Sequence, residues 1–330
     1  MINAEKNKSY KILFLTSRAL QVSNFIKELS NKNNYQIITD KNFFRFNSNK
    51  NKLRSFLANF NIAFVYNFGA IIPEWAIKLV PMVNIHFSLL PRYRGAYPVP
   101  AFLLNGDKKT GVSWHILTKE IDQGNILLQK QTFTDVKTLG FSAKQVFDSL
   151  EEINFNILRL VIQNIKQGLD KLEINFLEQG NDCHMFGKNR LQDLLVLLIN
   201  AVKNNCGKKQ DNFLASYVPI TLLKTKNSYV SFIKNTAKEI FNRVRAFNPD
   251  PIARTYVKFI NNRREFLLFE VDFVNYYKLK PGRIAFVKKH GLFVGTLLGT
   301  LLIKKAGFPG KKILEQQQLL SLKGKITKFY

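Results

Sequence analysis

Acidic side chains are scarce in this sequence, which holds 50 lysines and arginines against 23 aspartates and glutamates in 330 residues, a formal net charge of +27. The excess is uneven along the chain. Residues 1–200 carry 25 basic and 16 acidic side chains, a net charge of +9, whereas residues 201–330 carry 25 and 7, a net charge of +18. AT-rich coding would enrich lysine everywhere, so the asymmetry favours a basic binding surface in the C-terminal part. Such a surface predicts a polyanionic partner, either nucleic acid or an anionic membrane.

Cysteines and long apolar runs are also few. Cys183 and Cys206 are the only cysteines and form no CxxC motif, which predicts neither a disulfide framework nor a zinc site, with a reducing compartment as the default. The longest apolar run, residues 291–303, contains three glycines and is about half as long as a membrane span requires. The N-terminus is polar and lacks the apolar core of a secretion signal. We therefore expect a soluble, cytoplasmic protein.

The first half of the chain alternates short apolar runs with helical patterns. The expected strands are residues 10–16, 35–38, 62–66, 83–87, 110–117 and 125–131, and the expected helices are residues 19–29, 53–60, 73–80 and 143–165. This alternation predicts an α/β domain in residues 1–170, with a doubly wound, mostly parallel sheet. Ligands of such sheets bind beyond the carboxyl ends of the strands.

The second half has a different pattern. Residues 171–216 are irregular apart from one helical stretch at 191–202, and we interpret them as a linker. A helix is expected after Thr236, whose spacing to Glu239 fits a capping box, and two prolines at 249 and 251 end it. Short β-like runs separated by turn residues then predict a small antiparallel β-barrel, OB-like in form, in a basic domain at residues 217–330.

The stretch from Val83 to Pro98, VNIHFSLLPRYRGAYP, is the most informative part of the sequence. Asn84, His86 and Ser88 alternate with apolar residues, so they share one side of a strand. A strand that is buried on both faces should be apolar at such positions, so three polar side chains in a row need partners or a function. A polar strand end would explain one histidine. Asparagine and histidine together before a Leu-Leu-Pro turn favour a site.

These residue types fit acyl transfer. An amide can donate to an oxyanion, and a histidine can take a proton from an attacking amine. Asp122, in the loop KEIDQGN, is the candidate carboxylate that orients the histidine, although Asp-x-Gly is also common in ordinary turns. Without a serine or cysteine in a nucleophile elbow, the set favours direct transfer to an amine. His115, in TGVSWHIL, is either a further site residue or a strand residue that bonds to a loop carbonyl.

The order and spacing of these motifs resemble the formyltransferase family that uses 10-formyltetrahydrofolate. The matching segments are N-x-H-x-S-L-L-P-x-Y-R-G-A-x-P at residues 84–98, G-D-x-x-T-G-V-S at 106–113 and I-D-x-G at 121–124. The resemblance implies that Asn84 holds the formyl oxygen, that His86 assists proton movement and that Asp122 orients the histidine. It also implies no metal and a folate site that is formed by Gly69, Ile71, Ile72, Ser88, Leu89, Leu90 and Pro91.

The second half resembles those members of the family that formylate methionine on initiator tRNA. Residues 243–257, RVRAFNPDPIARTYV, are similar to a segment of these enzymes. Their C-terminal barrel holds the tRNA, which fits the uneven charge of this chain. The resemblance implies that the chain binds charged initiator tRNA, and we expect it to be a monomer. The basic residues that we expect to contact the tRNA are Arg45, Arg245, Arg263, Arg264, Lys288 and Lys289.

Two departures leave the acceptor open. The first βα turn reads Thr16-Ser17-Arg18 instead of Gly-Thr-Pro, and the basic loop after the second strand, residues 40–52, is short. Together with His115, the short loop favours an alternative, an N-formyltransferase for an amino-sugar nucleotide or another small amine. A third hypothesis is an RNA-binding protein that has lost catalysis, against which the intact trio argues. A formyltetrahydrofolate hydrolase would share the trio but gives no reason for the basic C-terminal part.

Overall fold

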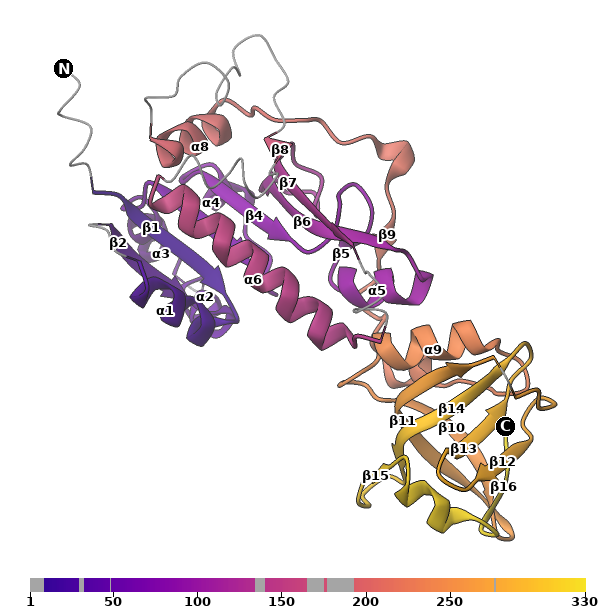
Figure 1. Cartoon of the computed structure of the whole chain (residues 1–330). Helices are drawn as coiled ribbons and strands as arrows, with labels where there is room; N and C mark the ends of the chain where they lie inside the picture. The colour runs from indigo at the N-terminus through magenta and orange to yellow at the C-terminus, as the bar shows by residue number, and fades with distance from the viewer. Residues whose placement is uncertain are drawn as a thin grey trace. The chain divides into compact units, whose positions relative to one another are not determined.

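The computed structural model describes residues 9–29, 33–47, 49–133, 140–164, 175–176, 193–275 and 277–330. These residues form two compact units (Figure 1), which are considered one at a time. The first unit takes its residues from 1–98, 109–133 and 149–218, and the second takes them from 99–108, 134–148 and 219–330. Among the described residues, no helix is long and apolar enough to cross a membrane.

The first unit is built on a sheet of seven strands in the order β2-β1-β3-β4-β6-β7-β8. Strands β1 (Lys11–Thr16), β2 (Asn34–Ile38), β3 (Ile62–Tyr66) and β4 (Met82–His86) pair in parallel. Strands β6 (Lys109–Ile116), β7 (Ile126–Phe133) and β8 (Asn175–Phe176) continue the sheet in antiparallel fashion. The expected α/β fold is confirmed. The sheet is mixed because a short turn, without a crossover helix, joins β6 to β7.

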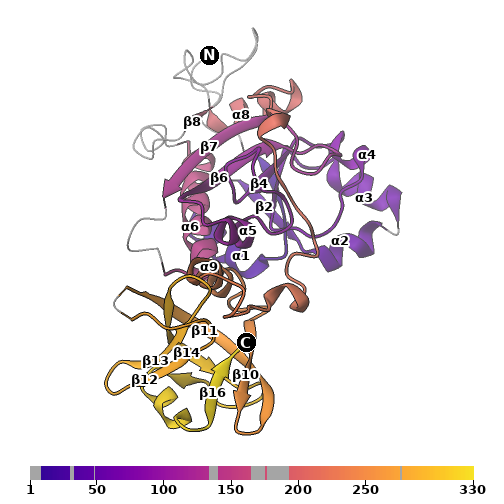
Figure 2. The same ribbon diagram turned by 90° about the vertical axis from the view of Figure 1, so that its right-hand side faces the viewer.

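Helices cover both faces of this sheet (Figure 2). Helices α2 (Asp40–Asn47), α3 (Lys50–Leu57) and α4 (Glu74–Ile77) lie on one face, where Phe43 and Leu53 pack in a buried cluster with residues of β1 and β3. Helices α1 (Ala19–Lys27) and α6 (Ala143–Ile162) lie on the other, where Phe25 stacks on Phe155. Coverage on both sides explains why the central strands are apolar almost throughout. Helix α2 occupies a segment that we expected to be a loop, and α5 (Pro98–Asn105) was not predicted.

The expected linker, residues 171–216, packs against the first unit where it is described. Helix α8 (Leu194–Lys203) is followed by an antiparallel bridge between Lys208 and Ile126 at the start of β7. The short helix η2 (Asn212–Leu214) leads to β9 (Tyr217–Val218), which pairs with β5 (Arg94–Gly95). We call residues 208–218 the strap. Cys206 is buried and disulfide-bonded, contrary to the expectation from the cysteine pattern, whereas Cys183 lies outside the described residues.

The second unit contains the expected antiparallel barrel. Its strands are β10 (Ala253–Phe259), β11 (Asn262–Val274), β12 (Ile284–Val287), β13 (Gly291–Gly295), β14 (Thr300–Gly307), β15 (Leu314–Glu315) and β16 (Ile326–Phe329). Their main order is β12-β13-β14-β11-β10-β16, and β15 pairs with β14. Helix α9 (Ala237–Ala246) begins with the predicted capping box of Thr236 and Glu239. Short helices η3 (Thr225–Ser228) and η4 (Gln318–Leu322) complete the unit.

Candidate active site

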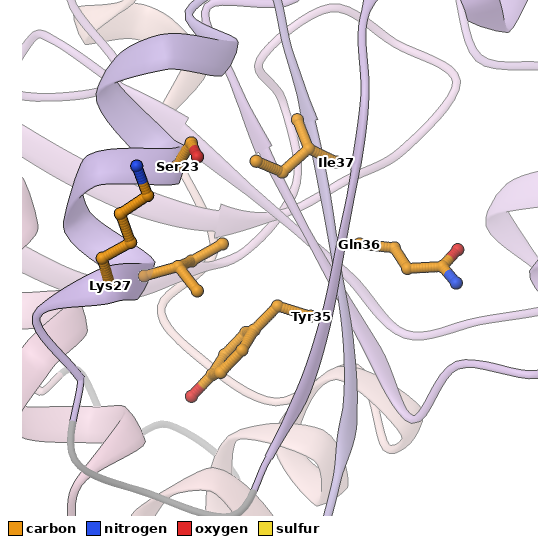
Figure 3. Close-up of a pocket in the computed structure, with 6 residues that line it drawn as sticks. Ser23, Lys27, Tyr35, Gln36 and Ile37 are labelled. Atoms are coloured by element: carbon orange, nitrogen blue, oxygen red, sulfur yellow. The ribbon is translucent and has the colours of Figure 1, made fainter.

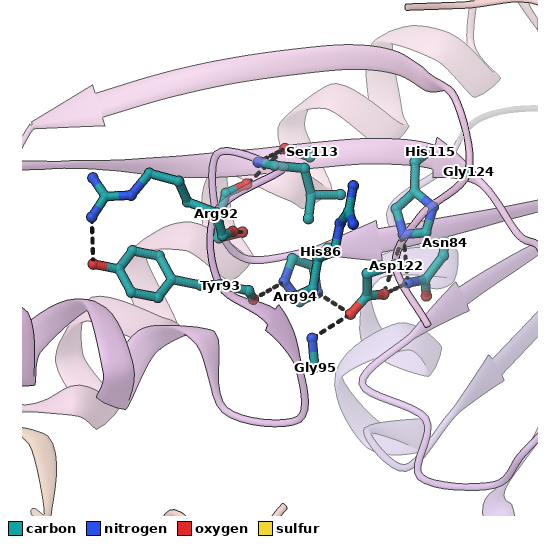
Figure 4. A network of polar contacts seen from close by, with 12 residues as sticks. Asn84, His86, Arg92, Tyr93, Arg94, Gly95, Ser113, His115, Asp122 and Gly124 are labelled. Carbon is teal, nitrogen blue, oxygen red and sulfur yellow. Dashed lines mark hydrogen bonds and ion pairs between the residues drawn. The ribbon is translucent and has the colours of Figure 1, made fainter. Parts of the chain in front are cut away.

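The candidate active site lies at the carboxyl end of β4. The parallel register brings Asn84 of β4 beside Val65 of β3, and the antiparallel register brings it beside His115 of β6. Asp122 lies in the turn between β6 and β7, and its backbone is in the left-handed region, with φ of 55°. Figure 4 shows Asn84, His86, His115 and Asp122 gathered in one polar cluster. The structure therefore brings together the three residues that we expected to be catalytic, and His115 joins them.

The amide of Asn84 donates both of its hydrogens inside the cluster. Its Nδ2 atom lies 2.9 Å from Asp122 Oδ1 and 2.9 Å from His115 Nε2. The other ring nitrogen of His115, Nδ1, lies 2.9 Å from the carbonyl oxygen of Ile116, which only accepts. Nδ1 therefore carries a hydrogen, and Nε2 accepts from Asn84. Asn84 can donate to a ligand oxygen once one of these two hydrogens is released.

Both ring nitrogens of His86 face acceptors. Nε2 donates to the carbonyl oxygen of Tyr93 at 2.8 Å, and Nδ1 lies 3.5 Å from Asp122 Oδ2. The side chains of His86 and Asp122 are only 8% and 9% exposed, so water screens their interaction little. Acceptors on both sides fix the ring plane, and a ring with a hydrogen on each nitrogen can donate to both of them. The contact with Asp122 is the one expected of a carboxylate that orients the histidine.

Asp122 is held in its ionised form. Burial by itself would raise the pKa of this carboxyl, but the charge of His86, the contact with His115 and the backbone donor of Gly95 outweigh burial. The shortest of these contacts comes from the backbone N–H of Gly95, which donates to Oδ2 at 2.7 Å. The net result is a pKa of Asp122 well below its usual range. The cluster thus keeps a fixed negative charge at neutral pH.

The turn after β4 is shaped by hydrogen bonds of its own. The hydroxyl of Ser88 donates to the carbonyl of Arg92 at 2.6 Å, and the hydroxyl of Ser113 donates to the carbonyl of Ser88 at 2.6 Å. The backbone N–H of Leu90 donates to the Ser113 hydroxyl at 3.2 Å, and the Leu90 side chain is buried. Ser88 and Leu90 therefore build the turn. Leu89 and Pro91 are both half-buried, so a ligand could reach part of each side chain.

The segment after β3 lies beside this turn, because β3 and β4 are paired in parallel and end at the same edge. Gly69 donates its N–H to Asp40 Oδ2 at 3.3 Å. Ile71 is 85% exposed, whereas Ile72 is buried. Among the described residues, the backbone groups of Ile71 and Ile72 have no hydrogen-bond partner. Unpaired N–H and C=O groups beside an exposed apolar side chain provide contacts for a flat, polar heterocycle.

The departure in the first βα turn has a structural explanation. Arg18 donates to Glu151 of α6 through Nε at 3.1 Å and through Nη2 at 2.8 Å. The hydroxyl of Tyr66, at the end of β3, donates to the same carboxylate. The pKa of Tyr66 is raised, first by burial and then by the carboxylate. These three bonds to one carboxylate fix the turn against α6 in place of the Gly-Thr-Pro sequence.

The basic residues that we expected to bind tRNA do not all lie at the surface. Arg245 is buried on α9, donates to the carbonyl of Phe141 at 2.8 Å and has a pKa lowered by burial to about 10. We therefore exclude it from a binding surface. The other five side chains are exposed: Arg45 on α2, Arg263 and Arg264 on β11, and Lys288 and Lys289 after β12.

Sequence reasoning missed the groups that surround the trio. The carbonyl of Tyr93 and the N–H of Gly95 are backbone groups, which no side-chain pattern reveals, although both lie within the matched motif. Gln210 of the strap, which bonds to the Asp122 turn, belongs to a segment with no recognisable pattern. A hollow between α1 and β2, lined by Ser23, Lys27 and Tyr35 (Figure 3), is separated from β4 by two strands and contains none of the trio. The described residues contain no cluster of potential metal ligands.

A two-domain α/β and barrel architecture with this Asn–His–Asp cluster is that of a formyl transferase. Residues 1–162 match the family described as formyl transferase, and residues 222–324 match the family described as formyl transferase, C-terminal domain. A curated relative, the methionyl-tRNA formyltransferase of Borreliella burgdorferi, is 30% identical over 263 residues, which are 78% of this chain and 70% of the relative. The chain belongs to the formyl transferase family.

Other curated relatives have the same description. The methionyl-tRNA formyltransferase of Thermotoga neapolitana is 29% identical over 270 residues, which cover 81% of this chain and 72% of that protein. The methionyl-tRNA formyltransferase of Buchnera aphidicola is 28% identical over 323 residues, which cover 97% of this chain and 85% of that protein.

Solved structures share the fold at lower identity. HypX from Aquifex aeolicus, in complex with tetrahydrofolic acid, aligns with a TM-score of 0.58 at 16% identity, over 96% of this chain and 48% of that chain. WlaRD, a sugar 3N-formyl transferase, aligns with a TM-score of 0.55 at 21% identity, over 92% of this chain and 99% of that chain.

Proposed function

We propose that this chain transfers the formyl group of 10-formyltetrahydrofolate to the α-amine of methionyl-tRNA. The observation that carries the proposal is the cluster of Asn84, His86 and an ionised Asp122 at the end of β4. The acceptor is supported by the description of the curated relatives as methionyl-tRNA formyltransferases and by the net charge of +18 on residues 201–330.

The chemistry is a direct displacement at the formyl carbon. The amine nitrogen attacks this carbon, the bond from the carbon to folate N10 breaks, and a proton passes from the amine to N10. During attack, the formyl oxygen becomes an oxyanion, to which Asn84 Nδ2 and the imidazolium of His86 can donate after release from their present partners. Asp122 stabilises the positive ring from 3.5 Å. Asn84, His86 and Asp122 thus each have a role in the displacement.

The folate fits the two segments that border this point. The pterin ring requires hydrogen bonds along its edge and apolar contact on its face. The unpaired backbone of Ile71 and Ile72 provides the first, and the exposed Ile71 side chain with half-buried Leu89 and Pro91 provides the second. We propose that Ser88 and Leu90 support this site without contacting the folate. The Ser88 hydroxyl already donates to a carbonyl within the turn, and the Leu90 side chain is buried.

A candidate surface for RNA lies on the barrel. The guanidinium of Arg263 lies 4.1 Å from the ring centre of Tyr256 and 5.0 Å from that of Tyr330, and Lys328 lies 5.3 Å from the latter. Tyr256 also stacks on Tyr229 at 5.5 Å. Cations layered on half-exposed aromatic rings form a typical contact for nucleic acid, in which phosphates pair with the cations and bases stack on the rings. We call these residues the aromatic-basic patch.

The test is a formyl-transfer assay that offers two acceptors in parallel. 10-Formyltetrahydrofolate is supplied with methionyl initiator tRNA in one reaction and with a thymidine-diphosphate amino sugar in the other. We expect formyl-methionyl-tRNA and no formylated sugar. Formylation of the sugar alone would reject methionyl-tRNA as the acceptor but support the formyl-transfer chemistry. No product in either reaction would reject the whole proposal. Gel filtration and cell fractionation test the further expectations of a monomer and a cytoplasmic location.

A further inference from the structure

Arg94 has an unusual environment for a cation. Its side chain is fully buried, and it donates to Gln210 Oε1 from Nε at 3.0 Å and from Nη2 at 2.7 Å. It also donates to Asn212 Oδ1 from Nη1 and Nη2, both at 3.1 Å, and to the hydroxyl of Tyr217 at 2.8 Å. These bonds use all the N–H groups of a guanidinium. The acceptors are neutral, and no ion pair of Arg94 occurs within the described ranges.

Arg94 determines the orientation of Gln210. A guanidinium only donates, so the amide of Gln210 must turn its oxygen to Arg94 and its Nε2 atom away. Nε2 then donates to the carbonyl of Asp122 at 2.8 Å and to the carbonyl of Gly124 at 2.8 Å. Gln210 is 7% exposed, so water competes little for these bonds. The strap is thereby bonded to the turn that carries the catalytic carboxylate.

The turn that carries Asp122 has a strained backbone, which neighbouring contacts must hold in place. Asp122 has φ of 55°, and a residue with a Cβ atom in the left-handed region costs roughly 1–2 kcal/mol. Gly124 is packed so closely that a Cβ atom there would lie 1.8 Å from the carbonyl oxygen of Ile116. Strained backbone persists where its surroundings fix it, and the two bonds from Gln210 are fixed contacts of this kind.

The strap also fixes the other side of the carboxylate. Gly95, which donates to Asp122 Oδ2, belongs to β5 and pairs there with Val218 of β9. The approach is close, since a Cβ atom on Gly95 would lie 2.4 Å from the carbonyl oxygen of Val218. Arg94 precedes Gly95 in the same strand. One buried network therefore controls both the backbone of Asp122 and the donor to its side chain.

We propose that Arg94 and Gln210 are positioning residues for formyl transfer, which hold the Asp122 carboxylate at the distance and angle that the histidine requires. The inference rests on the proposed function, because it concerns the rate of the same reaction. Neither residue contacts the reacting atoms. Removal of the network should therefore slow the chemical step and leave folate binding almost unchanged, since a shift of about 1 Å in a catalytic group costs on the order of 10²-fold in rate.

Two substitutions at one position separate positioning from stability. Gln210→Glu retains the oxygens that face Arg94 and gives the guanidinium an ion pair, but it removes both donors to the Asp122 turn. Gln210→Met retains the volume and removes the amide altogether. The control is Asn212→Ala, which also removes acceptors of Arg94 but breaks no bond to Asp122 or Gly124.

The measurements are kcat and KM for 10-formyltetrahydrofolate from pH 4 to 9, with circular dichroism to establish folding. We expect both Gln210 variants to lower kcat by roughly 10- to 100-fold with KM changed by less than about threefold, and Asn212→Ala to stay within about threefold of the wild type. The acid limb of kcat/KM should move to higher pH. Without the two Gln210 bonds the Asp122 turn can shift, and a carboxylate that moves away from the Gly95 N–H, from His86 of β4 and from His115 of β6 binds a proton more readily.

Three results would overturn the proposal: a wild-type kcat and pH profile in Gln210→Glu, an equal loss in Asn212→Ala, or failure of Gln210→Glu to fold. The last result would make Gln210 a stability residue. Absence of formyl transfer by the wild-type protein would instead reject the proposed function, so the two failures are distinguishable.

Discussion

The sharpest test of the site is Asp122→Asn, which changes one charge and almost no volume. The carboxylate accepts from Gly95 N and Asn84 Nδ2 and faces His86 Nδ1 at 3.5 Å. An amide in its place retains one oxygen, and its nitrogen must then face a donor. The substitution therefore removes the negative charge beside the imidazolium and misorients the neighbouring Asn84.

The magnitude follows from the geometry. Unit charges at the 3.5 Å that separates His86 from Asp122 attract by about 5 kcal/mol at an effective dielectric constant of about 20. The amide dipole and the relaxed site recover part of this energy. If 3–4 kcal/mol is lost from the transition state, at about 1.4 kcal/mol for each factor of ten, kcat falls by roughly 10²- to 10³-fold.

The assay is single-turnover formyl transfer to methionyl-tRNA at saturating 10-formyltetrahydrofolate. Asp272→Asn, which makes the same change at an exposed position of β11, is the matched control and should leave kcat unchanged. A kcat within threefold of the wild type in Asp122→Asn would refute the assigned role of the carboxylate.

The same variant, Asp122→Asn, should also change how the free energy of unfolding depends on pH. Because the pKa of Asp122 is lowered by folding, its ionised form stabilises the native state above the unfolded pKa of about 3.9. This contribution is lost as the pH falls towards the folded pKa. The difference in free energy of unfolding between the wild type and Asp122→Asn, measured in urea, should be largest near pH 7 and should narrow below about pH 4. A difference that does not depend on pH would contradict the linkage.

Three further predictions concern other parts of the molecule. Asn84→Ala and His86→Ala should each lower kcat by at least about 10²-fold in the same assay, and near-normal turnover would reject that residue's role. Gly124→Ala should lower the free energy of unfolding by more than about 3 kcal/mol in urea, because the new Cβ atom would lie 1.8 Å from a carbonyl oxygen, and an unchanged value would show that the turn can relax. Replacement of Arg263 and Arg264 by alanine should weaken tRNA binding. It should also reduce the slope of the logarithm of the binding constant against the logarithm of the salt concentration by up to about two, whereas an unchanged slope would place the RNA elsewhere.

The sequence predicts most of the first unit because its signals are local. Continuous apolar runs identify β1 and β3, and the spacing of Thr236 and Glu239 identifies the start of α9. The trio could be proposed because Asn84 and His86 interrupt such a run with polar side chains at its end. The family motif then added Asp122, which its local pattern alone would have left as a turn residue.

The remainder depends on contacts between distant residues. The antiparallel course of β6 places His115 opposite Asn84, and only this register makes the histidine a partner of the amide. Nothing in the local sequence marks Gln210, because its role arises from two backbone carbonyls 86 and 88 residues away. Arg245 was misplaced for a similar reason. A basic residue on an amphipathic helix usually faces water, and here the tertiary packing of α9 buries it.

The position of the strap determines where this chain can be cut into separate parts. A gene fragment that ends near residue 170, where the sequence pattern changes, encodes strands β1 to β7 and the trio but omits Gln210 and the β9 partner of β5. A chimera that exchanges the barrel should therefore retain residues up to Val218, because Gln210 and the β9 partner of β5 lie in this stretch and the first unit ends there. In evolutionary terms, a lineage that loses its barrel keeps a working site only if the strap remains with the catalytic part.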